Sequence, residues 1–146
     1  MLPALDPQAI IESHYQDFLT DLAKSTFSGD VEYSYASRLA VSTDNSIYQQ
    51  LPQAVVFPKS IDDLSLIGKT ANPYQDVKFS ARGGGTGTNG QSLTSGIVVD
   101  VSRYMDQVLE VNAEENWARV QAGVVKDQLN DVLKPLGFFF APDLST

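Results

Sequence analysis

The first apolar pattern in the chain indicates an amphipathic helix near the N-terminus. Apolar side chains recur there at spacings of three and four residues, which places them on one face of a helix. Asp6 can cap this helix, with Pro7 at its first position, and the pattern runs to about Lys24. His14 lies within it and is interpreted as an ordinary surface histidine. The apolar face consists of Ile10, Ile11, Tyr15, Phe18, Leu19 and Leu22.

Three short apolar runs predict buried strands, at residues 54–57, 77–81 and 96–101. Ser60 follows the first run and can cap a helix of residues 61–71, which an Asn-Pro pair ends. A strand, a helix and a strand in this order predict a right-handed unit with parallel strands. The expected inward face of the helix consists of Ile61, Leu64 and Ile67, with Leu66 beside them.

The pattern changes after residue 103. Residues 108–111 and 117–121 are two short runs around a polar turn, which predicts an antiparallel hairpin. A second helix follows and is closed by Gly137, and the three phenylalanines 138–140 predict a buried strand. The face of this helix consists of Val124, Val125, Leu129, Val132, Leu133 and Leu136.

Together these elements predict an α+β fold in two lobes. Residues 1–30 are expected to form a helical lead-in and residues 31–103 a first lobe around a small parallel sheet. Residues 104–146 would begin a second lobe with antiparallel strands. In the polar segment before the first buried strand, Asp44 and Ser46 are interpreted as mainly structural, satisfying a turn or capping a short helix.

Five of the ten glycines fall within residues 82–90, between two of the predicted strands. Such a loop can turn its N–H groups inward as a nest for an anion. A flexible linker does not fit between buried strands. Residues 85–90 also match the Rossmann G-x-G-x-x-G fingerprint, but that fingerprint opens a helix, and Gly96 with a β-branched run follows too soon. A Walker A loop is excluded because no Gly-Lys-Ser/Thr follows. We therefore favour a pyrophosphate loop that joins two strands.

Composition narrows the possible functions. The chain has 146 residues and a net charge of −8 at pH 7, which argues against nucleic acid or an anionic membrane surface as partner. It has no cysteine and one histidine, so a disulfide, an iron–sulfur ligand set and a zinc site are not expected. No apolar run reaches transmembrane length and the N-terminus does not read as a signal peptide, so we expect a soluble cytoplasmic protein.

Four motifs follow one another along the chain: Thr43-Asp44-Asn45-Ser46-Ile47-Tyr48, residues 54–60, the glycine loop Arg82-Gly83-Gly84-Gly85-Thr86-Gly87-Thr88-Asn89-Gly90, and Ala141-Pro142-Asp143-Leu144-Ser145-Thr146. In these motifs the chain resembles the FAD-linked oxidases of the vanillyl-alcohol oxidase and p-cresol methylhydroxylase type. It is most similar to the large bacterial dehydrogenases of the D-lactate and D-2-hydroxyglutarate class, in which a flavin half is fused to an iron–sulfur half. The resemblance implies the N-terminal piece of a much longer protein.

The resemblance also implies how a cofactor is held. FAD should be non-covalent, because the loop lacks the histidine through which some relatives attach it. Arg82 can either pair with a phosphate or tie the loop to an acidic neighbour, since arginine suits both uses. No catalytic residue and no metal ligand is expected in this chain, and any iron–sulfur cluster would lie in the missing C-terminal part. The implied cofactor-binding residues are Arg82, Gly83, Gly84, Gly85, Thr86, Gly87, Thr88, Asn89, Gly90, Pro142, Asp143, Ser145 and Thr146.

The implied reaction is the oxidation of a D-2-hydroxy acid, such as lactate, glycolate or 2-hydroxyglutarate, to a 2-oxo acid. Electrons would pass through FAD to iron–sulfur centres or another acceptor. The alternative is a non-catalytic nucleotide-binding or interaction module. We expect the 146-residue chain by itself to fold at least in its first lobe, to be colourless and inactive, and to self-associate through residues 138–140.

Overall fold

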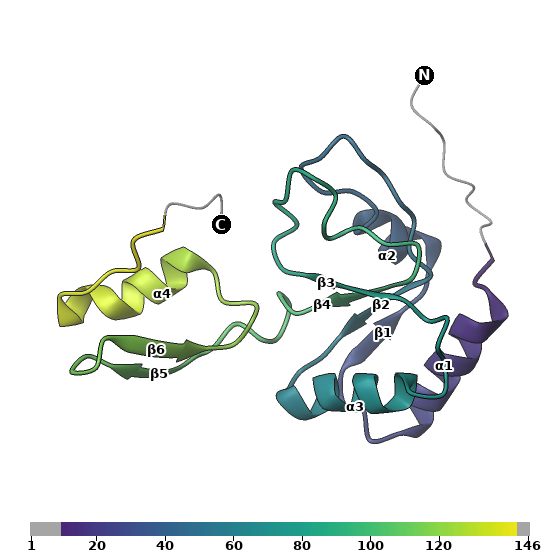
Figure 1. The fold of residues 1–146 in the computed structure, drawn as a ribbon, viewed down its shortest axis with the longest axis horizontal. Helices are drawn as coiled ribbons and strands as arrows, with labels where there is room; N and C mark the ends of the chain where they lie inside the picture. The colour runs from purple at the N-terminus through teal and green to yellow at the C-terminus, as the bar shows by residue number, and fades with distance from the viewer. Residues whose placement is uncertain (1–9, 143–146) are drawn as a thin grey trace.

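A computed structural model describes residues 10–142 of the chain. Its centre is a four-stranded sheet with the strand order β1-β2-β4-β3 (Figure 1). Strands β2, β4 and β3 run parallel, which confirms the parallel group expected around Val55, Phe79 and Val98, and β1 is added antiparallel at the edge. The strands are β1 Asp30–Glu32, β2 Ala54–Phe57, β3 Phe79–Arg82 and β4 Ile97–Asp100.

The two central strands, β2 and β4, are buried along their whole length. Parallel strands covered on both faces read as continuous apolar runs, which is why their sequences were recognisable. Alternate side chains point to opposite faces of the sheet. Val56 and Val99 pack into the core formed with helices α1 and α3, whereas Val55 and Val98 pack with Val41 on the side of α2. Figure 1 shows α1 and α3 below the sheet and α2 above it.

Helix α1 (Ser13–Lys24) forms as expected but begins late. The expected start at Asp6-Pro7 lies outside the described residues, and Ile10 is 84% exposed in the non-helical segment before the helix. The residue before the helix, Glu12, is held by a contact distant in sequence, because its N–H donates to Oε1 of Gln53 at 3.0 Å and its Oε1 accepts from Nε2 of Gln53 at 3.1 Å. This pairing anchors the chain where the helix begins.

Helix α3 (Ile61–Ala71) has the predicted bounds and the predicted cap, because the Ser60 hydroxyl accepts a hydrogen bond from the Asp63 N–H at 3.1 Å. Its inward face differs from the expectation. Ile61 is 75% exposed, and the buried residue of the first turn is Asp63. The Asp63 carboxylate accepts hydrogen bonds from the N–H groups of Ser28 and Lys59, at 2.9 and 2.8 Å, and these contacts turn Ile61 outward.

Two elements of the sheet region were not expected from the pattern. Strand β1 is only three residues long and half-buried, which is too short to show a period of two. Helix α2 (Tyr35–Ala40) has six residues, and Ser34 caps it by accepting from the N–H of Ser37. Its Arg38 is buried and donates from Nε to the Pro52 carbonyl at 2.6 Å.

The expected hairpin is confirmed as β5 (Val108–Asn112) and β6 (Trp117–Val120), which pair antiparallel. Helix α4 (Lys126–Leu133) packs beside it and continues into the 3₁₀ turn η1 (Lys134–Leu136). Gly137 ends the helical segment with φ +81°, in the left-handed region that glycine tolerates. We call residues 106–142 the hairpin unit and residues 10–105 the sheet unit, since Tyr104 and Met105 still pack against the sheet cores.

The expected buried strand at residues 138–140 is wrong. No strand forms there, and Phe138, Phe139 and Phe140 are 37%, 75% and 45% exposed. A strand needs a neighbouring strand for its backbone groups. Here the Phe140 N–H donates instead to the side-chain oxygen of Asn130 on α4, at 2.7 Å.

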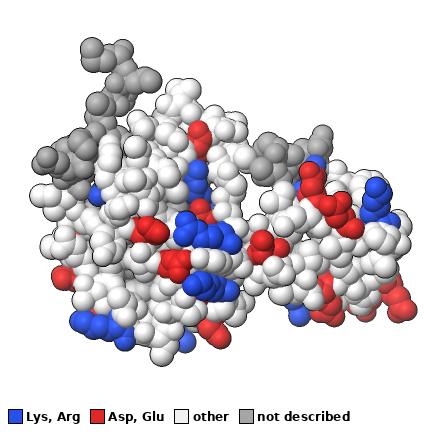
Figure 2. All heavy atoms as spheres, turned by 180° about the vertical axis from the view of Figure 1, so that it is seen from behind, with Lys and Arg blue, Asp and Glu red and all other residues white. Residues whose placement is uncertain are grey.

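The surface carries both charges side by side. Figure 2 shows Lys and Arg side chains interleaved with Asp and Glu on the face behind that of Figure 1. At one such place Asp30 lies 2.9 Å from Nζ of Lys59 and 3.8 Å from Nη1 of Arg103. Among the helices within residues 10–142, none has both the length and the apolar character needed to cross a membrane.

Candidate functional site

The glycine loop joins strand to strand. Strand β3 ends at Arg82, β4 begins at Ile97, and residues 83–96 between them contain neither helix nor strand. Because β3 and β4 are adjacent and parallel, this loop must return from the end of one strand to the start of the other. Figure 1 shows it rising above the sheet beside the segment that precedes β2. The prediction of a strand–loop–strand connection is confirmed, and a Rossmann turn is excluded.

Two glycines of the loop adopt a conformation that other residues rarely take. Gly85 and Gly90 have φ values of +66° and +73°. Side chains also lie where Cβ atoms would be. A Cβ on Gly85 would collide with the guanidinium of Arg82, and one on Gly90 would lie 3.1 Å from the ring of Tyr48. The loop therefore rests closely on side chains beneath it.

A third side chain supports the middle of the loop. A Cβ on Gly87 would collide with the side-chain amide of Gln91, and Oε1 of Gln91 accepts a hydrogen bond from the Asn89 N–H at 3.0 Å. Gln91 therefore occupies one of the N–H groups that the sequence left open for a phosphate. Sequence reasoning missed this residue, and its position directly after the loop was the only available signal.

Most of the remaining loop amides have no acceptor among the residues that the structure describes. Within residues 10–142, the N–H groups of Gly83, Gly84, Gly85 and Gly87 form no hydrogen bond. Backbone N–H groups are strong donors that are normally paired when water is displaced from them. Unpaired donors grouped in one glycine-rich turn are the arrangement that receives an anionic ligand.

Arg82 is tied into the protein. Its Nη1 donates to the Val41 carbonyl and to the Ser92 hydroxyl, both at 3.4 Å. The Ser92 hydroxyl donates to Oδ2 of Asp44 at 3.2 Å. The geometry therefore connects Arg82 with an acidic neighbour through Ser92, which is one of the two uses expected for it. Pairing with a phosphate stays a prediction.

Asp44 closes a local turn as well as this contact, because its Oδ1 accepts from the Ser46 N–H at 2.8 Å. Hydrogen bonding to the Ser46 side chain holds the pKa of the Asp44 carboxyl below its usual value, and the nearby charge of Arg82 acts in the same direction. Asp44 is therefore held as a carboxylate. The turn confirms the structural interpretation of this segment, whereas the link to the glycine loop was not foreseen.

A cavity of about 350 Å³ lies between the glycine loop and the hairpin unit. Gly83 and Gly84 line it from the loop, and the turn of residues 122–125 lines it from the other side. Gln128 of α4 also faces this cavity, and its Oε1 accepts from the Val125 N–H at 3.0 Å. The glycine loop thus borders a space that residues of both units line.

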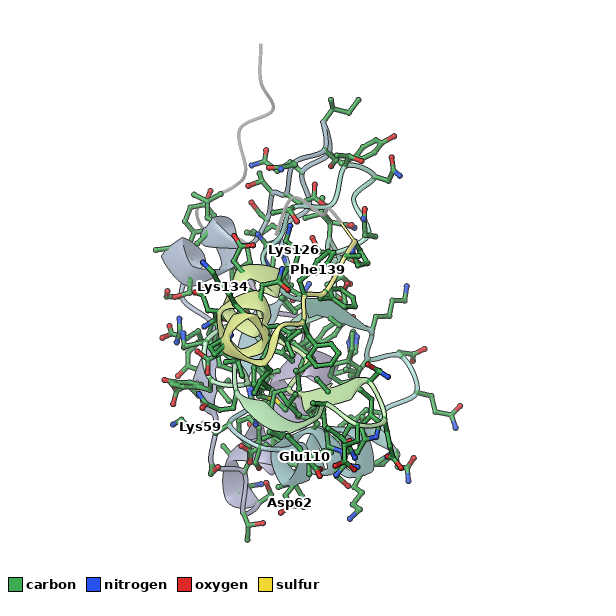
Figure 3. The ribbon with its side chains drawn as sticks, turned by 90° about the vertical axis from the view of Figure 1, so that its left-hand side faces the viewer. Lys59, Asp62, Glu110, Lys126, Lys134 and Phe139 are labelled. Carbon is green, nitrogen blue, oxygen red and sulfur yellow. The ribbon has the colours of Figure 1, made fainter. Side chains whose placement is uncertain are left out.

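A larger cavity of about 630 Å³ lies within the hairpin unit, between the hairpin and α4. Figure 3 looks onto this unit and shows Phe139 beside α4 above the hairpin. Its lining is mostly apolar and aromatic, and it includes Trp117 and Leu133 but no residue of the glycine loop. Because no glycine of the loop lines this cavity, whereas Gly83 and Gly84 line the smaller one, we place the candidate site at the smaller cavity.

The second group of expected site residues comes from the end of the chain. Pro142 is exposed and lies outside helices and strands. Asp143, Ser145 and Thr146 lie outside the described residues. Their role therefore stays a prediction.

Comparison with known proteins also points to a nucleotide cofactor. Residues 52–146 match the family described as FAD binding domain. Over 148 residues the chain is 56% identical to D-2-hydroxyglutarate dehydrogenase of Haemophilus influenzae, covering 100% of this chain and 14% of that protein.

Two solved structures show the same fold at low identity. Alkyldihydroxyacetonephosphate synthase matches with a TM-score of 0.72 and 22% identity, over 92% of this chain and 28% of that one. p-Cresol methylhydroxylase matches with a TM-score of 0.71 and 14% identity, over 92% of this chain and 27% of that one. The fold is the expected one of the vanillyl-alcohol oxidase and p-cresol methylhydroxylase type. The chain belongs to the FAD binding domain family.

The residues present fit the pyrophosphate of FAD. Two loop glycines with unpaired N–H groups, Gly83 and Gly84, line a cavity, and close approach is possible because glycines carry no side chain there. Phosphate groups accept such charge-assisted hydrogen bonds readily. The chain has no cysteine and the loop no histidine, so the loop offers no side chain of those types for covalent attachment.

Proposed function

We propose that this chain is the N-terminal part of an FAD-dependent oxidoreductase and that its glycine loop holds the FAD pyrophosphate. One observation carries the proposal: Gly83 and Gly84, whose N–H groups have no acceptor among the described residues, line a cavity between the sheet unit and the hairpin unit. The chain spans 14% of the length of the D-2-hydroxyglutarate dehydrogenase that it matches, so the activity belongs to a longer polypeptide.

In this proposal the chain binds and orients the cofactor. Backbone N–H groups from Gly83 to Gly87 hold the phosphate oxygens, and the side chains of Thr86, Thr88 and Asn89 add hydrogen bonds. Pro142, Asp143, Ser145 and Thr146 contribute from the other side, and Arg82 supplies positive charge below the loop. Bound FAD would supply the capacity to accept the electrons of the oxidation. The division that we propose is a lead-in of residues 1–30, a first lobe of residues 31–103 and a second lobe from residue 104.

We propose a D-2-hydroxy acid of the lactate, glycolate or 2-hydroxyglutarate class as substrate, and a 2-oxo acid as product. The relative of 56% identity supports 2-hydroxyglutarate within this class. We assign no catalytic residue to this chain. An electron acceptor, and any iron–sulfur cluster, would lie outside these residues, since the chain has no cysteine. The proposed location is the cytoplasm.

The test is a substitution in the complete polypeptide that contains this chain. Gly85→Val should abolish bound flavin, because Val is strained at φ +66° and collides with the Arg82 guanidinium. Gly68→Val is the matched control, since Gly68 lies on α3 with open space around its Cβ position. Flavin absorbance per protein and circular dichroism are measured for both variants.

The expected result is a folded Gly85→Val protein without flavin and a Gly68→Val protein with the wild-type content. Wild-type flavin content in Gly85→Val would overturn the assignment of the loop. Absence of flavin from the wild-type protein, together with binding of another nucleotide, would favour the alternative of a non-catalytic nucleotide-binding module.

We also infer that the isolated 146-residue chain self-associates through the apolar face of its hairpin unit. Phe139 is 75% exposed and Phe138, Phe140 and Trp117 are at least 37% exposed around a mostly apolar cavity. Exposed apolar patches of this kind are typical of surfaces that bind another protein surface.

A further inference from the structure

The two ends of the glycine loop are joined by a short chain of polar side chains. Arg82 precedes the loop, and Ser92 follows its last glycine by two residues. The guanidinium of Arg82 donates to the Ser92 hydroxyl at 3.4 Å, and the hydroxyl donates to Asp44 at 3.2 Å. We call these three residues the loop brace. Asp44 lies 38 residues before Arg82 in the sequence and is held in place by its own turn with Ser46.

We propose that Asp44 is a positioning residue for FAD, which acts through Ser92 and Arg82 to hold the glycine loop in the conformation that receives the pyrophosphate. This inference rests on the proposed function of the loop. It adds Asp44 and Ser92, which do not touch the cofactor, to the residues that determine its affinity.

The direction of the hydrogen bonds gives Asp44 its effect. A serine hydroxyl has one proton, and when that proton goes to Asp44 its lone pairs are left to accept from Arg82. Ser92 is 8% exposed, so water compensates little for a lost partner. In Asp44→Asn, Oδ1 can keep the bond from the Ser46 N–H, and an NH₂ donor then faces Ser92. The Ser92 proton would then have no acceptor at Asp44, and Ser92 would lose the contact that holds its hydroxyl where it accepts from Arg82.

The position of Arg82 matters because the loop lies directly on it. A Cβ on Gly85 would collide with this guanidinium, so a shift of the guanidinium changes the space beneath Gly85. Gly83 and Gly84, which face the cavity, lie between Arg82 and Gly85 in the chain. Affinity depends on whether these N–H groups already point at the phosphate before it binds, because ordering a loop on binding reduces the net affinity.

The brace is distinct from the core that holds the sheet together. Asp44 is half-buried at the surface, and none of its three members belongs to the apolar clusters of the sheet unit. Loss of the brace should therefore weaken FAD binding more than folding. Substitution of a residue with only a structural role would instead weaken folding more than FAD binding.

The experiment uses the complete polypeptide with its flavin removed and measures the dissociation constant of FAD by calorimetry. The variants are Asp44→Asn, Ser92→Ala, Ser92→Thr and the double variant of Asp44→Asn with Ser92→Ala. The matched control is Asp62→Asn, an exposed aspartate on α3, which lies below the sheet in Figure 1 whereas the loop lies above it. The melting temperature of each flavin-free protein and the visible spectrum of each loaded protein are recorded.

Asp44→Asn and Ser92→Ala should each raise the dissociation constant roughly tenfold, the effect of losing one charge-assisted hydrogen bond. The double variant should be no weaker than the worse single variant, because both substitutions break the same chain of bonds. Ser92→Thr, which keeps the hydroxyl, and Asp62→Asn should bind like the wild type. Melting temperatures and the flavin spectrum should be unchanged.

Wild-type affinity in Asp44→Asn and Ser92→Ala would overturn the inference, and so would additive effects or a Ser92→Thr protein as weak as Ser92→Ala. If Asp44→Asn does not fold, Asp44 has a structural role and the inference is overturned for Asp44, while Ser92→Ala decides for Ser92. A wild-type protein that binds no FAD would overturn the proposed function itself, so the two failures are distinguishable.

Discussion

The sheet unit and the hairpin unit both contain large apolar side chains, but the sheet unit buries many of them, whereas the hairpin unit buries Leu133 alone. Phe18 and Val55 have no exposed surface, whereas Trp117 is 37% and Phe139 75% exposed. Helices cover the sheet on both faces, whereas the hairpin has α4 on one side and every residue of β6 is exposed. A layer of secondary structure is stable only when its apolar face is packed against another. The sheet unit therefore has a core packed on both faces of its sheet, whereas the hairpin is packed on one face only.

The largest expected effect separates the two units by matched substitutions of phenylalanine. Phe18→Ala should lower the free energy of unfolding by roughly 3–5 kcal/mol, because it leaves a cavity in the core. Phe139→Ala should change it by less than about 0.5 kcal/mol, as is usual for an exposed position. Urea unfolding of the 146-residue chain measures both. Equal losses of unfolding free energy in the two variants would contradict the claim that the sheet unit is packed more completely than the hairpin unit.

The second prediction concerns FAD and the isolated 146-residue chain. The chain should be colourless and bind FAD more weakly than about micromolar, since a ligand held from one side loses contacts while the costs of ordering remain. The complete polypeptide should bind FAD tightly. A visible spectrum and a calorimetric titration of both proteins test this. A yellow preparation of the 146-residue chain would mean that the sheet unit alone suffices.

The third prediction concerns the buried carboxylate of the sheet unit. Asp63→Ala should cost about 2 kcal/mol, because it leaves the part-buried N–H groups of Ser28 and Lys59 without their acceptor. Asp62→Ala, at the exposed neighbouring position, should change stability by less than about 0.5 kcal/mol. Urea midpoints at pH 7 compare the two variants.

The contribution of Asp63 should also depend on pH. Burial raises the pKa of this carboxyl, but hydrogen bonds from Ser28 and Lys59 outweigh burial, and the pKa lies below the ordinary value of 3.8 for an aspartate. A carboxyl with a lowered pKa stabilises the folded state fully above its unfolded pKa and loses this contribution as pH falls through the folded one. The stability difference between wild type and Asp63→Asn should therefore shrink below about pH 3.8. A difference that grows on acidification would contradict this assignment.

The smallest expected effect concerns the apolar face of the hairpin unit. The isolated 146-residue chain should show an average mass that rises with concentration in sedimentation equilibrium. Phe139→Ser should shift this association by roughly tenfold in dissociation constant, an effect on the scale of burying one apolar side chain. Ile47→Ser is the control, since Ile47 is 94% exposed on the sheet unit. An equal shift in both variants would argue against a specific face.

Much of the architecture could be predicted because it rests on local patterns. Residues 54–57 and 97–100 are continuous apolar runs, and a strand buried on both faces has this pattern. The short distance from Gly90 to the next β-branched run excluded a helix in the glycine loop, and the structure has none there. The hairpin followed from two short runs around a polar turn.

Other features depended on partners far away in the chain. Helix α1 begins directly after Glu12, which pairs with Gln53. These two residues lie 41 positions apart, so a capping pattern at Asp6 could not indicate this start. Residues 138–140 are apolar enough for a strand, yet the side chain of Asn130 pairs with Phe140. In both cases a tertiary contact decided which local preference was realised.

The sequence by itself determined the class of site: a run of glycines between two strands provides backbone donors and excludes side chains, whatever the rest of the chain does. Only the tertiary structure decided what holds that run in place. Arg82, Ser92 and Asp44 meet because the loop folds back over the strand that precedes it, beside the segment before β2. Hydrogen bonds act over about 3 Å, so partners 48 residues apart, such as Asp44 and Ser92, become visible only when the chain has folded.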